Sequence, residues 1–594
     1  MKIITKVQVT MMSEMLMHPG IILILVGLLA MIAPKCVRKV LLAVGPLAAL
    51  YVAFNLQLGT EVSIDFVRGY KLGILHVDKL SWIFTFIFSV LALISGIYAC
   101  HNENRMEALC AMAYAGCAIG VTLAKDWLTL IFFWEAMAVT SVFLVWCKNS
   151  KVSRRAGFRY LLVHMLGGNL LLAGIFLHLG HGGDATIANL VNGPHDYTYW
   201  LILIGICVNV AMPPVNAWLV DAYANSTITG GVFMSCLTTK VAVYALLRVF
   251  AGSELIMWGG VLMALYGACY AIMENDMRRL LAHHIISQTG FMVAGAGIGT
   301  GLAMNGATAH AFCDILFKSL LFMCAGAIMY ATGIGHINKL GNMAKKMPFV
   351  CICFFAAAFS ISGIPLFNGF ISKAITVNAA YAAGQGMVYT LLEIASIGTF
   401  LSIPLKMGYF IFLRKDDKGA EIKTQLPINM KVAMGMGAFL CFLYGVCPGL
   451  LYQYLPFEAP AYHPFLPEHI LQYVQMLGMA MVPFMMYLSH MEPHTAISLD
   501  TDWFYRKPFV VVVKETSMIF CALCSALGNV WKVMYEKFME LTANPMEFLD
   551  ARPFHKRKKY NPENYRTAIA DPMMITLTVL GCAIGYIVAH LKSL

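Results

Sequence analysis

In His310-Ala-Phe-Cys-Asp314-Ile-Leu-Phe-Lys318-Ser-Leu-Leu-Phe322, three ionisable side chains stand four residues apart within an otherwise apolar run. Two further lysines, Lys240 and Lys373, have equally hydrophobic neighbours. Ionisable groups are costly at membrane depth, and those that are present commonly mark an ion pathway. These five residues therefore predict an ion route through a membrane protein.

The composition around this run is that of a helical membrane protein. Of 594 residues, 59% are hydrophobic and 12% are charged, and apolar windows recur along the chain. A window of about 20 apolar residues is long enough to cross a bilayer as a helix. We therefore predict an all-α, polytopic fold. About sixteen helices are expected, near residues 18–34, 39–57, 80–100, 107–123, 127–147, 158–180, 199–220, 227–250, 257–274, 280–299, 302–331, 348–381, 386–413, 431–450, 468–489 and 572–592.

The cysteine pattern indicates no redox or metal site. The 17 cysteines are scattered through apolar segments, with no charged or histidine residues grouped around them, which is typical of small buried side chains. The sequence also has no phosphate-binding glycine loop and no haem or iron–sulfur spacing. We expect no cofactor, no metal and no catalytic residue in this chain, so any catalysis would belong to an assembly that it joins.

Lysine and arginine set the predicted orientation. They are concentrated in loops that follow odd-numbered spans, such as 148–155, and they are absent from the opposite loops 181–197 and 451–467. The positive-inside rule places the N-terminus outside the cytoplasmic (inner) membrane of a bacterial or archaeal cell. The net charge of +11 is then a topological surplus, and we expect no nucleic-acid partner.

Two spans contain helix-breaking residues. The seventh contains Pro213 and Pro214, and the twelfth contains Gly363 and Pro365. Such breaks are tolerated at membrane depth only where they are buried in protein or line a wet cavity. Because the breaks lie five spans apart, we expect two inverted-topology repeats with ion pathways at the broken helices.

The chain is expected to have seven parts. A pattern that occurs twice in the sequence supports the repeats. Arg248 follows Lys240 by eight residues, and Arg414 follows Lys406 by eight residues. The long stretch after the fifteenth span is followed by a basic linker, which a further crossing would place outside. We therefore expect this stretch to lie along the membrane surface. The parts are N-terminal helices 1–106, first repeat 107–250, second repeat 257–413, C-terminal core helices 431–490, lateral amphipathic helix 500–545, linker 546–571 and final span 572–594.

Two groups of residues are candidates for proton transfer. Glu135 lies eight residues past the interfacial aromatic Trp127, so its carboxyl group would be about 12 Å deep and either paired or protonated. The alternative is a structural hydrogen bond between helices. His310, Asp314 and Lys318 share one helical face and would form a relay. The alternative there is a local ion pair between Asp314 and Lys318.

The other candidates lie on three separate spans. Lys373 follows the second helix break, where it would gate an exit channel, and the alternative is a lysine that extends to the membrane interface. Lys240 lies on the eighth span, between the two halves, and the alternative is simple pairing with another helix. His283 and His284 lie near the start of the tenth span and are expected to cap it rather than conduct.

Several short motifs occur in a fixed order between about residues 75 and 415. They are Trp134-Glu135, Trp218-Leu-Val-Asp221-Ala, Thr239-Lys240-Val-Ala-Val-Tyr244, Asn275-Asp-Met-Arg-Arg-Leu-Leu-Ala282 with Ile286-Ser-Gln-Thr-Gly290, Lys318-Ser-Leu-Leu-Phe322, and Gly363-Ile-Pro365 with Gly369-Phe-Ile-Ser-Lys373. In this order the chain resembles the antiporter-like subunits of respiratory complex I and of Mrp-type multi-subunit sodium/proton antiporters.

The resemblance implies a core of about 14 helices with two inverted five-helix repeats. It also implies a conducting axis made of a glutamate on span 5 and lysines on spans 7, 8, 11 and 12. Carried over, these residues are Glu135, Lys240, Lys318 and Lys373. The surface helix and the final span are similar to those of the distal, largest antiporter-like subunit of complex I.

One position departs from the family pattern. The pattern places a lysine five residues before the proline of the broken seventh helix, where this sequence has Asn209. The cation expected beside Glu135 is therefore missing. We expect Glu135 to be neutral unless another base, such as His164 on span 6, replaces that lysine.

The sequence therefore predicts a membrane subunit that moves protons, alone or in exchange for sodium ions. It would belong to a complex I-like oxidoreductase, a membrane-bound hydrogenase or an Mrp-type antiporter, with other membrane subunits and the lipid bilayer as partners. The alternative is a non-conducting structural anchor, which Lys240, Lys318 and Lys373 argue against and Asn209 argues for. A stand-alone solute transporter is disfavoured because the broken helices have no polar cluster that would hold a substrate.

Overall fold

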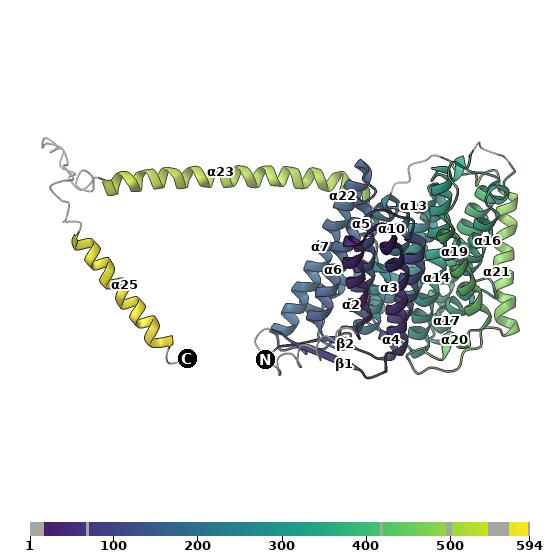
Figure 1. Ribbon diagram of the computed structural model, residues 1–594, viewed down its shortest axis with the longest axis horizontal. Helices are drawn as coiled ribbons and strands as arrows, with labels where there is room; N and C mark the ends of the chain where they lie inside the picture. The colour runs from purple at the N-terminus through teal and green to yellow at the C-terminus, as the bar shows by residue number, and fades with distance from the viewer. Residues whose placement is uncertain are drawn as a thin grey trace. The chain divides into compact units, whose positions relative to one another are not determined.

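The computed structural model of the protein describes residues 17–66, 70–415, 420–494, 500, 502–543 and 570–591. It divides into two compact units, Met1–Asp502 and Trp503–Leu594. The first unit is a bundle of roughly parallel helices (Figure 1). Eleven of the described helices are long and apolar enough to cross a membrane. The predicted all-α polytopic fold is confirmed.

The chain enters the bundle through three helices and a short hairpin. α4 begins at a capping box in which Asp78 and Ser81 satisfy each other's backbone N–H groups. The hairpin between α3 and α4 was not predicted, although β1 alternates polar and apolar residues over its whole length, which is the signal of a strand. The elements are α2 (Pro19–Ile32), α3 (Lys35–Asn55), β1 (Glu61–Asp65), β2 (Lys71–His76) and α4 (Lys79–Ala99).

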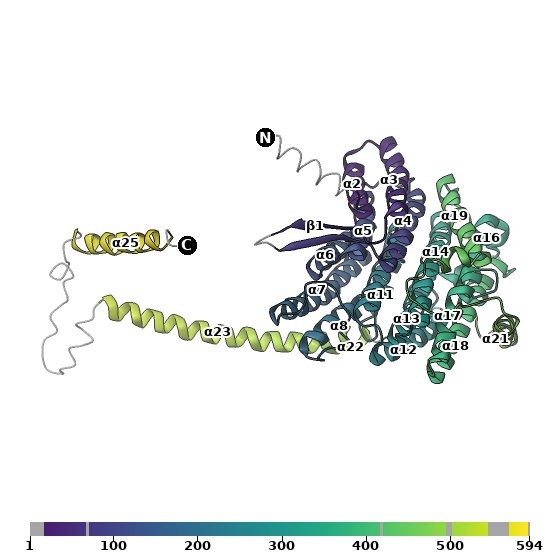
Figure 2. The ribbon, with the colours of Figure 1, turned by 90° about the horizontal axis from the view of Figure 1, so that it is seen from below.

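Two successive sets of helices then follow the same plan. The first set comprises α5 (Arg105–Leu123), α6 (Trp127–Trp146), α7 (Lys151–Gly180), α8 (Tyr197–Val210), α9 (Ala217–Asn225), α10 (Ile228–Met234) and α11 (Thr238–Val249). The second set comprises α12 (Glu254–Met273), α13 (Met277–Ile298), α14 (Gly301–Thr332), α16 (Pro348–Ser362), α17 (Asn368–Ala382), α18 (Gly386–Phe400) and two π-helical segments, Leu401–Met407 and Tyr409–Leu413. Helices α11 to α14 lie between α6–α8 on one side and α16–α18 on the other (Figure 2).

Local details repeat between the two sets. Asp126 caps the start of α6 and Asp276 caps the start of α13, and each forms an isolated antiparallel bridge, with Thr186 and with His336 respectively. The two arginines of the repeated lysine–arginine pattern also have similar surroundings. Arg248 Cζ lies 5.1 Å from the centre of the Tyr244 ring, and Arg414 Cζ lies 5.5 Å from that of Phe410. These matching details agree with two repeats, although the residue limits given above for the seven parts stay predictions.

The two predicted helix breaks are present and are built alike. α8 is followed by Ala211 and α16 by Gly363. Both capping residues have a left-handed backbone, with φ of 64° and 74°. A left-handed residue at this position stops a helix and redirects the chain. The chain then resumes as α9 and α17, so each break leaves helix-end carbonyl groups inside the bundle.

Two irregularities were not predicted. The eighth span is divided at Ser235–Leu237 into α10 and α11, where the backbone N–H of Thr238 donates to the hydroxyl of Tyr114 at 3.0 Å. The thirteenth span becomes π-helical around Pro404, which lacks the N–H that a regular helix needs. The break between α10 and α11 involves a contact with another helix, and no local sequence signal indicates it.

The remaining elements complete both units. The first unit closes with α19 (Ile428–Val446), α20 (Gly449–Tyr452) and α21 (Pro467–Met486) after the short elements Ile337–Lys339 and α15 (Met343–Lys346). The second unit contains α23 (Pro508–Ala543) and α25 (Ala570–Leu591), preceded by the short helix α22 (Asp502–Arg506) at the junction. At about 1.5 Å per residue, α23 is roughly 54 Å long. The described part of the chain resumes at Ala570, so most of the predicted linker lies outside it. The placement of α23 along the membrane surface stays a prediction.

Candidate functional site

The centre of the site is a buried carboxylate shared by two lysines. α14 packs against α4, α10, α13, α16, α17 and α19, and its His310, Asp314 and Lys318 are completely buried. Asp314 Oδ2 lies 2.5 Å from Lys240 Nζ, and Asp314 Oδ1 lies 3.9 Å from Lys318 Nζ. Lys240, Asp314 and Lys318 are therefore in contact, whereas the relay from His310 through Asp314 to Lys318 stays a prediction.

The shorter contact joins the two sets of helices. Lys240 is on α11, in the first set, whereas Asp314 and Lys318 are both on α14, in the second. The local Asp314–Lys318 pair is therefore accompanied by a closer pair with Lys240, which is the pairing with another helix that was given as the alternative for Lys240. If all three groups are ionised, the cluster carries one uncompensated positive charge, which a buried site disfavours. Loss of a proton from either lysine would neutralise it.

Lys373 is bound to the second helix break. Its Nζ donates to the carbonyl of Ile361 at 2.8 Å and lies 5.0 Å from the centre of the Phe291 ring. Ile361 is in the last turn of α16, where carbonyl groups have no partner within the helix. The side chain of Lys373 is completely buried, so the alternative of a lysine that extends to the membrane interface is wrong.

Two histidines connect this region to neighbouring helices. His310 Nδ1 lies 3.2 Å from the hydroxyl of Ser372, which is adjacent to Lys373 in α17. His284 is completely buried, and its Nε2 lies 2.6 Å from the hydroxyl of Ser402. The expectation that His284 caps α13 is wrong, because that helix begins earlier, with Asp276 as its cap.

A second polar group lies in the first set of helices. α7 presents Tyr160, His164 and Gly168 at intervals of four, on one helical face. A Cβ atom on Gly168 would lie 1.7 Å from Glu135 Oε1, so the carboxyl group rests directly against the α7 backbone. Glu135 is half-buried rather than enclosed. His164 is one turn along α7 from Gly168. Its ring packs edge to face against Trp218, with ring centroids 4.5 Å apart.

Asn209 stands where the family pattern has a lysine. It is completely buried on α8, and its amide lies against His164. Among the described residues, no lysine or arginine forms an ion pair with Glu135. His164, given above as an example of a base that would replace the missing lysine, thus lies beside Asn209 and one helical turn from the contact between Glu135 and Gly168, and its replacement of that lysine stays a prediction.

Many buried polar atoms of the described residues have no hydrogen-bond partner. An unsatisfied buried polar atom costs about 1–3 kcal/mol, and native proteins usually satisfy such atoms with internal water. These atoms are therefore suited to contact internal water. Among them are atoms of Glu135, His164, Asn209, Tyr223, Thr239, His283, His284, Gln288, Thr289, His310 and Asn368.

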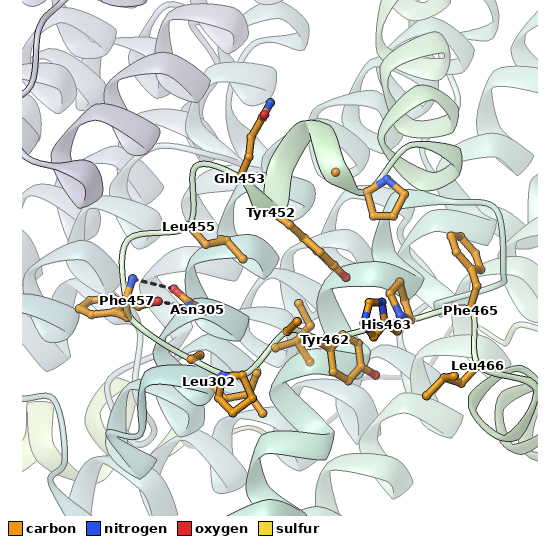
Figure 3. A pocket seen from close by; sticks show the side chains of 17 residues that line it. Leu302, Asn305, Tyr452, Gln453, Leu455, Phe457, Tyr462, His463, Phe465 and Leu466 are labelled. Atoms are coloured by element: carbon orange, nitrogen blue, oxygen red, sulfur yellow. Dashed lines mark hydrogen bonds between the residues drawn. The ribbon is translucent and has the colours of Figure 1, made fainter.

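A cavity of about 770 Å³ is lined mainly by residues between Pro448 and Leu466, in α20 and the loop after it, together with Ile375 of α17 and two residues of α14 (Figure 3). The amide of Asn305 holds the backbone of Phe457 on both sides, by bonds of 2.7 and 3.0 Å, and so fixes the loop that forms one wall. The hydroxyl of Tyr452 donates to the carbonyl of Ile371 at 2.7 Å. Within the described residues, no group of three histidine, cysteine or acidic side chains is placed to hold a metal ion.

The predicted residues fall into two places. Lys240, His310, Asp314, Lys318 and Lys373 come together around α14, whereas Glu135 lies apart, beside α7. His284 was missed as a member of the central group. Its spacing of four from Gln288, which donates to Thr399 at 3.2 Å, places both residues on one face of α13. This spacing was the available signal.

Comparisons with known proteins agree with the fold. Residues 124–402 match the model of a family described as NADH:quinone oxidoreductase/Mrp antiporter, TM. An uncharacterized protein of Methanocaldococcus jannaschii is 29% identical over 388 residues, which are 62% of this chain and 80% of that protein. A Na(+)/H(+) antiporter subunit of Alkalihalophilus pseudofirmus is 28% identical over 330 residues, which are 53% of this chain and 66% of that protein. A chain of the membrane-bound sulfane sulfur reductase, an archaeal respiratory membrane complex, matches with a TM-score of 0.69 and 23% identity, covering 95% of this chain and 99% of that one.

Proposed function

The chain belongs to the family of antiporter-like membrane subunits shared by NADH:quinone oxidoreductases and Mrp antiporters, and from this premise we propose that it moves protons across the membrane, alone or in exchange for sodium ions. It does so as one member of a larger assembly of the complex I, membrane-bound hydrogenase or Mrp type. The observation that carries this proposal is the single carboxylate of Asp314 between Lys240 and Lys318.

This arrangement acts as a switch. Asp314 now favours Lys240, at 2.5 Å, over Lys318, at 3.9 Å. When Lys240 loses its proton or moves away, the carboxylate becomes available to stabilise the charged form of Lys318. Coulomb interactions are strong in a poorly polarisable interior, so a change of charge at one lysine alters the proton affinity of the other. A proton can then move from one lysine of the Lys240–Asp314–Lys318 cluster to the other without any redox group in this chain.

The second half of the route runs from Lys318 toward Lys373. The carbonyl of Ile361 accepts a hydrogen bond from Lys373 whether the amine is charged or neutral, because both forms carry N–H groups. His310 and Ser372 link α14 to the same segment of α17. The cavity beside α17 contains Ile375, two residues past Lys373, in its mostly apolar wall, and we assign to Lys373 the role of the last ionisable carrier before it.

The chain is expected to sit in the cytoplasmic membrane of a bacterium or archaeon, with its N-terminus outside. The distribution of lysine and arginine among the loops supports this orientation. Its expected partners are other membrane subunits, the lipid bilayer and the transported ions. A non-conducting anchor is disfavoured, because buried charges are costly and apolar residues of similar volume would hold the helices equally well.

The proposal is tested in everted membrane vesicles that contain the assembled complex from its native host. Energised vesicles should acidify, and the rate should fall when the gene for this chain is replaced by the Lys318→Ala variant. Repeating the assay over a range of sodium concentrations separates proton transport from sodium/proton exchange. Equal acidification in vesicles that lack the chain altogether would show that it does not conduct.

Glu135 is expected to matter less than the central lysines. Because no described lysine or arginine pairs with its carboxyl group, Glu135→Gln replaces a neutral acid with a neutral amide of similar shape. We expect the variant to retain at least about half of the wild-type translocation rate, whereas restoring a cation with Asn209→Lys should ionise Glu135. Difference infrared spectroscopy of the carboxyl band, with Glu135→Gln as the reference, measures this directly. A band already ionised at pH 6 in the wild type would mean that another cation pairs with Glu135.

The long C-terminal helix is expected to hold the complex together. α23 exposes large apolar side chains, including Val510, Ile519 and Phe520, and an extensive apolar surface of this kind needs lipid or protein to cover it. Deleting residues 508–594 should release the chain from its partners on a native gel. Deleting only 570–594 serves as the comparison that retains α23. A chain lacking 508–594 that still migrates with the full complex would rule out this bracing role.

A further inference from the structure

The eighth span is interrupted at a place that has no role in the route described above. We propose that the buried hydroxyl groups of Tyr114, Tyr160, Tyr223 and Thr238, gathered at this break, pass protons between His164 and the Lys240–Asp314 pair. This hydroxyl cluster would give the chain a connection between its two polar groups despite the loss of the family lysine at Asn209. The inference rests on the proposed function.

The four hydroxyl groups come from four different helices and meet at Thr238. Tyr114 Oη lies 2.6 Å from Thr238 Oγ1 and also accepts the backbone N–H of Thr238 at 3.0 Å. Tyr160 Oη lies 2.7 Å from Ser141 Oγ and against Thr238 on its other side. Tyr223 Oη faces Thr238 without a hydrogen bond of normal geometry. These five side chains, Ser141 included, are almost completely buried. The hydroxyl groups of Tyr114 and Thr238 are partners, as are those of Tyr160 and Ser141, whereas Tyr223 Oη has no partner of normal geometry among the described residues.

One end of the hydroxyl cluster reaches His164. Tyr160 and His164 are one turn apart on α7, and their ring centroids are 4.2 Å apart. Both ring nitrogens of His164 are buried without a hydrogen bond of normal geometry in the described part of the chain. A neutral imidazole can accept a proton at one nitrogen and release one from the other, which the amide of Asn209 cannot do. His164 is therefore suited to deliver a proton to Tyr160.

The other end reaches the charge cluster through the break between α10 and α11. Cys236, in this break, is two residues before Thr238, and its thiol donates to the carbonyl of Ile315, the residue after Asp314, at 3.4 Å. Ser235 lies beside it, with its Oγ 3.2 Å from Cys236 Sγ. A helix break leaves backbone polar groups available inside the bundle. The break thus places polar groups next to Thr238 in the chain and next to Asp314 on α14.

Hydroxyl groups suit this role because each is both a donor and an acceptor. In the proposed step, protonated His164 gives its N–H proton to Tyr160 Oη, while Tyr160 gives its own proton onward to Thr238 Oγ1. Thr238 in turn releases its proton toward the Lys240 amine, through the polar groups of the break and internal water. Each oxygen loses one proton as it gains another, so no charge remains on the cluster. The net change is one proton moved from His164 to Lys240.

The test replaces single hydroxyl groups in the assembled complex in everted vesicles. Tyr160→Phe and Tyr223→Phe keep the aromatic ring and remove one oxygen, so packing is largely retained. Tyr98→Phe is the matched control, since Tyr98 is completely buried but donates to the carbonyl of Met323, away from the cluster. We expect the translocation rate to fall by roughly tenfold or more in Tyr160→Phe, in line with the loss of a proton-transfer group, and to stay near wild type in Tyr98→Phe.

Two further measurements separate a relay from a structural role. The ratio of rates in H₂O and D₂O should rise in Tyr160→Phe, because proton transfer becomes the slow step, and a packing defect would leave it unchanged. Tyr223→Phe removes no hydrogen bond of normal geometry to a described residue, so a lower rate in this variant would not be explained by the loss of such a bond. If Lys318→Ala conducts normally, the proposed function itself is wrong. If Lys318→Ala is inactive while Tyr160→Phe and Tyr223→Phe both match Tyr98→Phe, only the hydroxyl relay is wrong.

Discussion

Lys318→Ala is expected to abolish ion translocation and to leave the complex assembled. The substitution removes the second lysine that competes for Asp314, so the carboxylate stays paired with Lys240 and the switch has one state. Losing a proton-transfer group typically costs a factor of about 10²–10⁴, so the rate in energised vesicles should drop at least 100-fold. The variant also removes the uncompensated charge, so it should not destabilise the bundle.

The control for this prediction is Lys151→Ala, which removes an exposed lysine at the start of α7. It changes the net charge of the chain by the same amount and leaves the buried Lys240–Asp314–Lys318 cluster unchanged. Complex amount on a native gel and vesicle acidification are measured for both variants. Rapid acidification with Lys318→Ala would contradict the assignment of Lys318 as a carrier.

The Lys240–Asp314 pair should show different effects on stability and on transport. Asp314→Asn leaves two buried lysines without a counter-ion, and breaking a buried ion pair in this way costs about 3–5 kcal/mol. We expect a lower melting temperature of the solubilised complex and no translocation. The double variant Asp314→Leu with Lys240→Met removes both partners of the closer pair, and apolar replacement of a buried pair is often neutral or stabilising. Because Lys318 stays buried without a carboxylate, the melting temperature should recover only in part, while translocation stays absent.

This pair of variants separates conduction from anchoring. The double variant keeps Lys318, so it retains the same net charge at this point as the wild-type cluster of two lysines and one aspartate. If its vesicles acidify at the wild-type rate, the pair only holds helices together, and the anchor interpretation gains support. If its melting temperature stays as low as that of Asp314→Asn, the loss of transport in the single variant would have to be attributed to damaged folding.

The positions of most helices could be predicted from local sequence alone. Apolar windows of bilayer length located the spans, because a transmembrane helix must satisfy its backbone internally and present apolar side chains over a fixed distance. Pro214 and Gly363 likewise located the two broken helices, because they change backbone geometry wherever they occur. The spacing of four placed His310, Asp314 and Lys318 on one face, since side-chain direction repeats with the helical turn.

The partners of these residues could not be predicted in the same way. Asp314 has Lys318 one turn away in sequence, yet its closer contact is Lys240, on a helix from the other half of the bundle. Lys373 binds the carbonyl of Ile361, which becomes available only because α16 ends there. The division of the eighth span also follows from a contact with Tyr114, on α5.

The sequence by itself thus determined the membrane fold, the two predicted breaks and the kinds of ionisable residue available inside it. Only the tertiary structure decided that one carboxylate serves two lysines and that His284 is inside rather than at a helix end. The physical reason is that helical periodicity and helix breaking depend on neighbours within a few residues. The charge that a buried group meets depends on which helices pack together, and those helices are far apart along the chain.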